Sequence, residues 1–122
     1  MTLLLRAAGS RDVPALAVLL HDRPLHPGER VLVLTDVSAP DGALVRAAAV
    51  VRDDAQRWLV VAAAVDNRWP PAADALVEQL RAEAIVDGAD ALVFSPGCSV
   101  EVLAHVLDRA LVDVGGAATV AL

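Results

Sequence analysis

The chain has 122 residues, a formal net charge of −6 and a hydrophobic content of 57%. That length suits a single domain over residues 1–122 with a sizeable core, and the negative charge argues against nonspecific binding to nucleic acid. No apolar run approaches the roughly 18 residues that a membrane span requires, no signal-peptide pattern is present, and one cysteine cannot form an internal disulfide. We therefore expect a cytoplasmic domain that binds neither nucleic acid nor membrane.

The first half of the sequence predicts a strand, a helix and then three strands in succession. Residues 3–20 read LLLRAAGSRDVPALAVLL, and residues 23–28 leave room only for a loop before the next strand. Hairpin signals at Pro40-Asp41-Gly42 and at Asp53-Asp54 separate the strand-like runs that follow. The pattern predicts antiparallel strands at about 2–7, 30–37, 43–52 and 57–65.

A crossover follows the fourth strand. Residues 58–65, WLVVAAAV, form a continuous apolar run, which is typical of a strand covered on both faces. From Ala72 to Val86, apolar residues recur at offsets of three and four on one helical face, and Gly88 suits the end of that helix. Residues 91–94 are again apolar, so we expect a strand at about 90–95 parallel to 57–65. The remaining sequence predicts a helix over 99–114 and a closing strand over 117–122.

In this order of elements the chain resembles the GCN5-related N-acetyltransferase family over nearly its whole length. The pattern "arginine-x-alanine, then D-x-P-A-L-x-x-L" within residues 3–20 is similar to the family's first strand and helix. The resemblance implies an α/β (α+β) fold, with a mixed, mostly antiparallel sheet flanked by about three helices. It also implies transfer of an acetyl group from acetyl-CoA to an amine, whose identity the sequence leaves open.

The family's pyrophosphate loop, Q/R-x-x-G-x-G/A, corresponds here to residues 68–73, RWPPAA. Arg68 fits the first position and Ala73 the last, but proline replaces the central glycine at Pro71 and has no N–H to donate. The resemblance implies that Arg68 and the amides of Ala72, Ala73 and Asp74 hold the pyrophosphate at a helix N-terminus. It also implies that strand amides near Val65 polarise the thioester carbonyl.

Asp66 follows the fourth strand, where the family splays its sheet, so it is our candidate catalytic residue for orienting the amine or accepting its proton; a strand-ending Asp-Asn turn is the alternative. The family's late tyrosine, often the general acid, has no counterpart, because position 111 is leucine and the chain contains no tyrosine. His21 and His26 are surface-loop residues or, less simply, bases. Cys98 is more simply a packed residue than a reactive thiol, and no residue spacing indicates a metal site.

Two rival interpretations remain open at this stage. The chain could be a catalytically inactive protein of this fold that serves as an interaction or assembly partner, as Pro71 and the missing tyrosine suggest. It could instead be an unrelated α+β domain with the same order of elements. An open edge at the closing strand, residues 117–122, also predicts a homodimer or a pairing with another protein, and Trp69 suits either a cofactor cleft or a protein interface.

Overall fold

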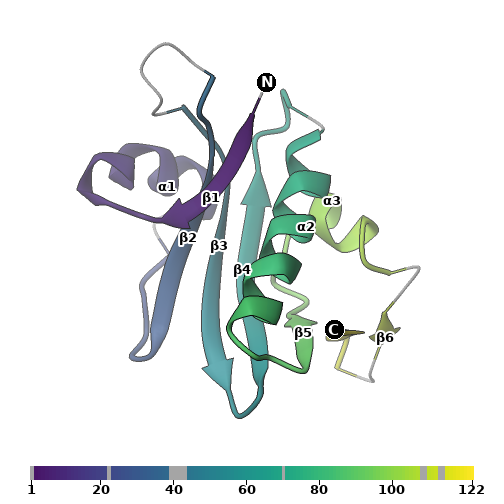
Figure 1. The fold of residues 1–122 in the computed structure, drawn as a ribbon. Coiled ribbons are helices and arrows are strands. Elements are labelled where there is room, and N and C mark those ends of the chain that lie inside the picture. Colours follow the sequence, from purple (N-terminus) through teal and green to yellow (C-terminus); the bar gives the residue numbers. More distant parts are fainter. Residues whose placement is uncertain (1, 22, 39–43, 70, 108–109, 113–114) are drawn as a thin grey trace.

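The computed structural model describes residues 2–21, 23–38, 44–69, 71–107, 110–112 and 115–122. Within these ranges the chain forms one seven-stranded sheet in the order β1-β2-β3-β4-β5-β7-β6 (Figure 1). Neighbouring strands are antiparallel except β4 and β5, which are parallel. The strands are β1 Leu3–Ala7, β2 Glu29–Asp36, β3 Leu44–Asp54, β4 Arg57–Val65, β5 Ala91–Phe94, β6 Leu111–Val112 and β7 Ala118–Ala121. The predicted mixed, mostly antiparallel sheet is confirmed, and so is the parallel pairing after the crossover.

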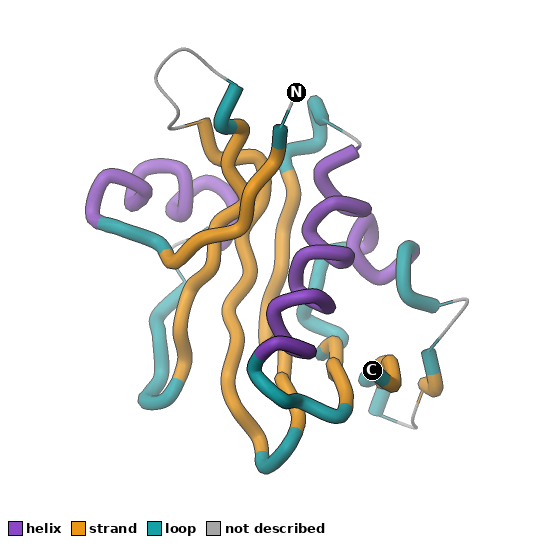
Figure 2. The backbone as a smooth tube through the Cα atoms, viewed as in Figure 1, coloured by secondary structure: helices purple, strands orange, loops and turns teal. Residues whose placement is uncertain are grey.

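Helices cover the two faces of this sheet unequally. The described helices are α1 Val13–Leu20, preceded by the 3-10 turn η1 Ser10–Asp12, α2 Pro71–Val86 and α3 Val100–Ala104. α2 and α3 share one face, and α1 packs on the other (Figures 1 and 2). Ala47 and Ala48 of β3 belong to the two different clusters, as the alternation of side chains along a strand requires. None of the helices in the described ranges is long and apolar enough to cross a bilayer.

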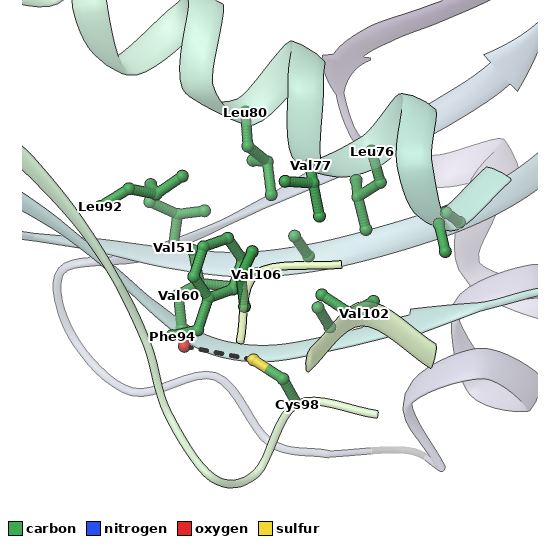
Figure 3. Close-up of a cluster of buried hydrophobic side chains, with 14 of the residues drawn as sticks. Val51, Val60, Leu76, Val77, Leu80, Leu92, Phe94, Cys98, Val102 and Val106 are labelled. Atoms are coloured by element: carbon green, nitrogen blue, oxygen red, sulfur yellow. Dashed lines mark hydrogen bonds between the residues drawn. The ribbon is translucent and has the colours of Figure 1, made fainter. Parts of the chain in front are cut away.

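The face under α2 and α3 carries the larger core. The apolar stripe predicted along residues 72–86 packs onto the sheet, with Leu76 and Leu80 fully buried. Phe94 at the end of β5 lies among these side chains together with Val102 and Val106 from the α3 region (Figure 3). Most of the other residues in this core are alanine and valine.

The C-terminal helix is much shorter than the sequence pattern predicts. A helix over 99–114 is wrong: α3 ends at Ala104, and Leu111–Val112 form the edge strand β6 instead. The sequence pattern places Leu103, Leu107 and Leu111 on the core face of that helix, but Val102 and Val106 are the fully buried residues, and Leu107 and Leu111 are exposed, Leu111 to 82%. Leu111 thus contributes little to the core, and Leu111 and Val112 gain backbone partners by pairing with β7.

The closing strand does not lie at the edge of the sheet. β7 pairs with β5 on one side and with β6 on the other, because β6 folds back beside it. The open edge that the sequence predicts at 117–122 is thus wrong in its position. Ala118 and Thr119 of β7 are paired on both sides within the described chain and cannot also pair with a second copy, and association of the protein stays a prediction.

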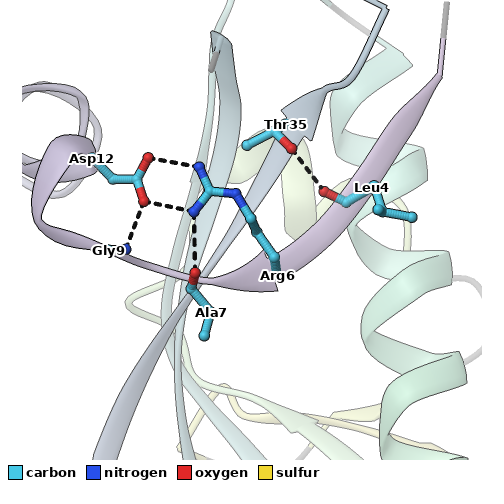
Figure 4. A network of polar contacts seen from close by, with 6 residues as sticks. All are labelled: Leu4, Arg6, Ala7, Gly9, Asp12 and Thr35. Carbon is cyan, nitrogen blue, oxygen red and sulfur yellow. Dashed lines mark hydrogen bonds and ion pairs between the residues drawn. The ribbon is translucent and has the colours of Figure 1, made fainter. Parts of the chain in front are cut away.

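The opposite edge, β1, is held in place by side chains. Arg6 donates two hydrogen bonds to Asp12, of 2.7 Å from Nη1 and 2.8 Å from Nη2, and the Gly9 amide donates a third of 2.7 Å (Figure 4). The Arg6 guanidinium lowers the pKa of the buried Asp12 carboxyl. On the outer side of β1, Gln79 of α2 accepts a hydrogen bond from the Leu5 amide (2.7 Å) and donates one to the carbonyl of residue 3. Gln79 thus takes the place of a neighbouring strand.

Candidate functional site

A β-bulge in β4 determines which N–H and C=O groups at the end of that strand face β3 and which face away from it. Val50 lies opposite Ala62 and Val51 opposite Val60, so Val61 is an extra residue in β4. Beyond the bulge, the Asp66 amide donates to the Arg46 carbonyl at 2.7 Å. Backbone groups of an antiparallel strand alternate in direction. The N–H and C=O groups of Ala63 and Val65 therefore point away from β3, towards the side where β5 would lie.

β4 and β5 separate at this point, and a loop takes the place of β5. Their pairing ends at Val60 and Phe94, after which the Ser95 amide donates to the Val60 carbonyl (2.9 Å) and the Ser99 amide to the Ala63 carbonyl (2.8 Å). Gly97 allows this close passage, because a Cβ atom there would lie 3.2 Å from the Val61 carbonyl oxygen. Among the described residues, no donor or acceptor of this loop reaches Val65. The last residue of β4 is thus left open on its outer side.

A groove of about 830 Å³ opens beside Val65 on the α1 side of the sheet. It is lined by α1, by the start of β3, by the end of β4 and the residues after it, and by the start of α3. The lining residues are Ala15, Val18, Leu19, His21, Leu44, Val45, Ala64, Val65, Asp66, Asn67, Arg68, Ser99 and Glu101. Its size is in the range of small-molecule binding sites.

Asp66 lies at the polar end of the groove and is held by two arginines. Arg68 binds both carboxylate oxygens, with distances of 3.1 Å from Nε to Oδ1 and from Nη2 to Oδ2, and Arg46 lies 3.5 Å from Oδ2. The hydrogen bonds from Arg68 lower the pKa of the Asp66 carboxyl, because they favour its ionised form. Arg46 also stacks on the Trp69 ring, 4.3 Å from its centroid. Asp66 is therefore a fixed carboxylate and a weak base.

Several backbone amides of the turn before α2 donate hydrogen bonds within the turn itself. The Arg68 amide donates to Asp66 Oδ1 (3.0 Å), the Trp69 amide to the Asp66 carbonyl (2.9 Å), and the Ala72 amide to the Trp69 carbonyl (2.9 Å). The resemblance implies that the Ala72 amide binds a phosphate. In the structure this amide instead donates within the turn. Ala73 is buried and Asp74 is exposed in the first turn of α2, and the Asp74 carboxylate lies 3.8 Å from His105.

Comparison with known proteins identifies the architecture. No family model matches the chain, and no curated protein does. Among solved structures, YhhK of E. coli bound to coenzyme A matches with a TM-score of 0.70 and 12% identity, over 100% of both chains. A ribosomal-protein-alanine N-acetyltransferase from Escherichia coli matches with a TM-score of 0.63 and 15% identity, over 97% of this chain and 89% of the other.

A GCN5-related N-acetyltransferase from Kribbella flavida is also similar, with a TM-score of 0.52 and 20% identity over 76% of this chain and 71% of the other. The chain has the GCN5-related N-acetyltransferase fold. The resemblance seen in the sequence is confirmed at the level of the fold, and identities this low carry the comparison no further. In this acetyltransferase fold the chain departs from the pattern at the pyrophosphate loop.

The structure brings together some of the predicted site residues and adds others. Val65, Asp66 and Arg68 line one groove, whereas Ala72, Ala73 and Asp74 lie in α2 and are not among its lining residues. Sequence reasoning missed Arg46, whose only signal was a charge inside an apolar strand. It also missed Ser99 and Glu101 as groove residues, because only the sheet brings residues 99–101 beside β4.

The remaining candidates take up simpler positions. His21 lines the groove, but His26 is exposed in the loop before β2 and lies outside the groove. Cys98 is buried, and burial raises the pKa of its thiol to about 12, so it stays protonated and fits the packed role. Within the described ranges, no three His, Cys, Asp or Glu side chains gather as a metal site would require.

Proposed function

We propose that this protein binds acetyl-CoA along the open end of β4 and transfers the acetyl group to an amine. The observation that carries the proposal is the bulge at Val61, which turns the Val65 backbone towards the groove beside the split between β4 and β5. An open strand edge offers an N–H and a C=O in register for an extended arm that contains amides. The open part of the β4 edge is short, since the Ala63 carbonyl already accepts a hydrogen bond from the Ser99 amide.

Phosphate binding would fall to Arg68 and the start of α2. Arg68 spends two N–H groups on Asp66, yet its side chain stays 86% exposed, so its outer N–H groups can meet a phosphate. The amides of Ala73 and Asp74 lie in the first helical turn, where the helix dipole favours an anion. Pro71 offers no donor and the Ala72 amide is engaged, so fewer amides are available than the family's loop provides.

The roles of the residues in the transfer follow from these contacts. Acetyl-CoA supplies an activated thioester. The Val65 N–H donates to the carbonyl oxygen, where negative charge develops during attack. The amine nitrogen forms the new C–N bond while the C–S bond breaks, the electron pair leaves with sulfur, and water carries the amine proton to it. Asp66, as a weak base, is a positioning residue that holds Arg68.

Calorimetry with acetyl-CoA, and with coenzyme A as a second ligand, tests this proposal. We expect both to bind and Arg68→Ala to weaken binding about tenfold, as loss of a charged hydrogen bond predicts. Arg52→Ala is the matched control, because Arg52 is exposed on β3 outside the groove, and it should leave affinity unchanged. Absence of binding to either ligand contradicts the proposal, and thiol release from acetyl-CoA with an amine supports its catalytic half.

The second candidate is a catalytically inactive partner protein with the same fold. The turn before α2 favours it, because the amides of Arg68, Trp69 and Ala72 donate to oxygen atoms of Asp66 and Trp69 within the turn. The chain also contains no tyrosine to act as a general acid. Under this candidate, coenzyme A binds or fails to bind but no amine releases thiol from acetyl-CoA. Light scattering at micromolar concentration then tests for a homodimer, and a monomer leaves a different protein as the partner.

A further inference from the structure

The groove beside Val65 is walled by a helix that has no polar residue. α1 reads VPALAVLL, and none of its residues is fully buried. A helix that is apolar all round is normally enclosed in a core, but Val18 is 73% exposed, and Leu44 of β3, which also lines the groove, is 41% exposed. Exposed aliphatic side chains from two elements that line one groove indicate an occupant that covers them.

One acidic residue that lines the same groove has no ion pair among the described residues. Asp66 is paired with Arg68 and also lies near Arg46, whereas Glu101 is exposed and has no ion pair among the described residues. The bond from the Ser99 amide to Ala63 fixes the first turn of α3, and thus Glu101, beside the end of β4. The Ser99 hydroxyl is buried next to it without a hydrogen-bond partner in the described part of the chain.

We propose that the acceptor is the N-terminal end of a peptide that combines an aliphatic first residue with a basic residue, and that Glu101 and α1 select these two features. This inference rests on the proposed function and names its substrate class. The aliphatic side chain packs between Val18 and Leu44, and the basic side chain pairs with Glu101. A peptide covers both rims at once, whereas a small diamine fills only the floor between them, and the net charge of −6 favours a cationic partner.

Acetyl transfer to amidated tripeptides tests the selection. With Leu-Lys-Gly, Leu-Glu-Gly and Gly-Lys-Gly as acceptors, we expect the first to have a KM about two- to fivefold lower than either of the others, the range of an exposed ion pair. The kcat should change little, because the contacts form equally before and during reaction. Preference for an aliphatic diamine over all three peptides overturns the proposal.

Variants of the two recognition elements sharpen the test. Glu101→Gln should abolish the difference between the Lys and Glu peptides, and Glu101→Lys should reverse it. Glu83→Gln on α2, outside the groove, is the matched control and should preserve it. Val18→Asp should raise the KM of the Leu peptide and leave that of the Gly peptide unchanged. If Glu101→Gln leaves the ratio of the Lys and Glu peptides intact, the assignment is wrong.

Binding without turnover separates this inference from the proposed function. Calorimetry with N-acetylated Leu-Lys-Gly in the presence of coenzyme A measures peptide recognition directly. Binding that Glu101→Gln weakens supports the inference even if no thiol is released, whereas absence of peptide binding overturns it. Absence of coenzyme A binding, by contrast, counts against the proposed function, and the peptide titration is then repeated on the protein alone.

Discussion

The face of the sheet under α2 and α3 buries its aliphatic side chains almost completely, whereas the face under α1 leaves many of them in contact with water. Leu76, Leu80 and Phe94 are fully buried on the first face. On the second face the buried cluster contains only Val33, Val45 and Ala48, with partly exposed α1 residues packed against it. The difference suggests that one face supplies most of the stability, while the other keeps surface free for binding.

The largest expected effect comes from the α2 face. Phe94→Ala should lower the free energy of unfolding by about 3–5 kcal/mol, because it removes a fully buried ring and leaves a cavity. Leu16→Ala on α1 should cost only about 1–2 kcal/mol, since Leu16 is partly exposed. Denaturant unfolding measures both. If Phe94→Ala does not fold, Phe94→Leu replaces it, and equal losses at the two faces contradict the comparison.

An ion pair between Arg6 and Asp12 attaches the segment before α1 to β1. Asp12→Asn should cost about 2–3 kcal/mol at pH 7, because it weakens a bidentate contact to a buried carboxylate. Asp53→Asn is the control, since its pair with Arg30 is exposed, and it should cost about 0.5 kcal/mol.

The pH dependence of this effect has a definite sign. Folding lowers the pKa of Asp12, so the pair stabilises the protein fully above the unfolded-state value of about 3.9 and loses its contribution as the pH falls through the folded pKa. The difference between the wild type and Asp12→Asn should therefore shrink below about pH 4. A constant difference across that range would mean that the charge of Asp12 is not the cause.

A smaller effect is expected where α2 reaches the edge of the sheet. Gln79→Ala should cost about 1 kcal/mol, because it removes both hydrogen bonds to the outer side of β1. It should also increase self-association, as an uncovered strand edge pairs with other chains. Gln56→Ala in the exposed turn between β3 and β4 is the control. Light scattering that shows no difference between the two variants would mean that Gln79 does not protect this edge.

Local patterns in the sequence predicted most of the sheet but not the end of the chain. The strands at 57–65 and 91–94 follow from continuous apolar runs, and the helix between them follows from an apolar stripe that does pack as expected. The helix predicted over 99–114 has a similar stripe. This helix prediction fails at Leu111, because the Leu111 side chain is exposed and its backbone pairs with β7 as a strand. Periodicity shows which residues could share a face, and only packing decides whether that face is used.

The sequence by itself determined the order of elements as far as β5, the parallel crossover and the loss of a donor at Pro71, since these depend on neighbouring residues and on the chemistry of single side chains. Tertiary structure alone decided that Val61 is a bulge, that Asp66 is held by Arg46 and Arg68, and that Glu101 lies in the same groove as Val65. The physical reason is distance along the chain. Strand register and the packing of β4 against the loop before α3 bring these groups together, and neither is encoded in any short segment.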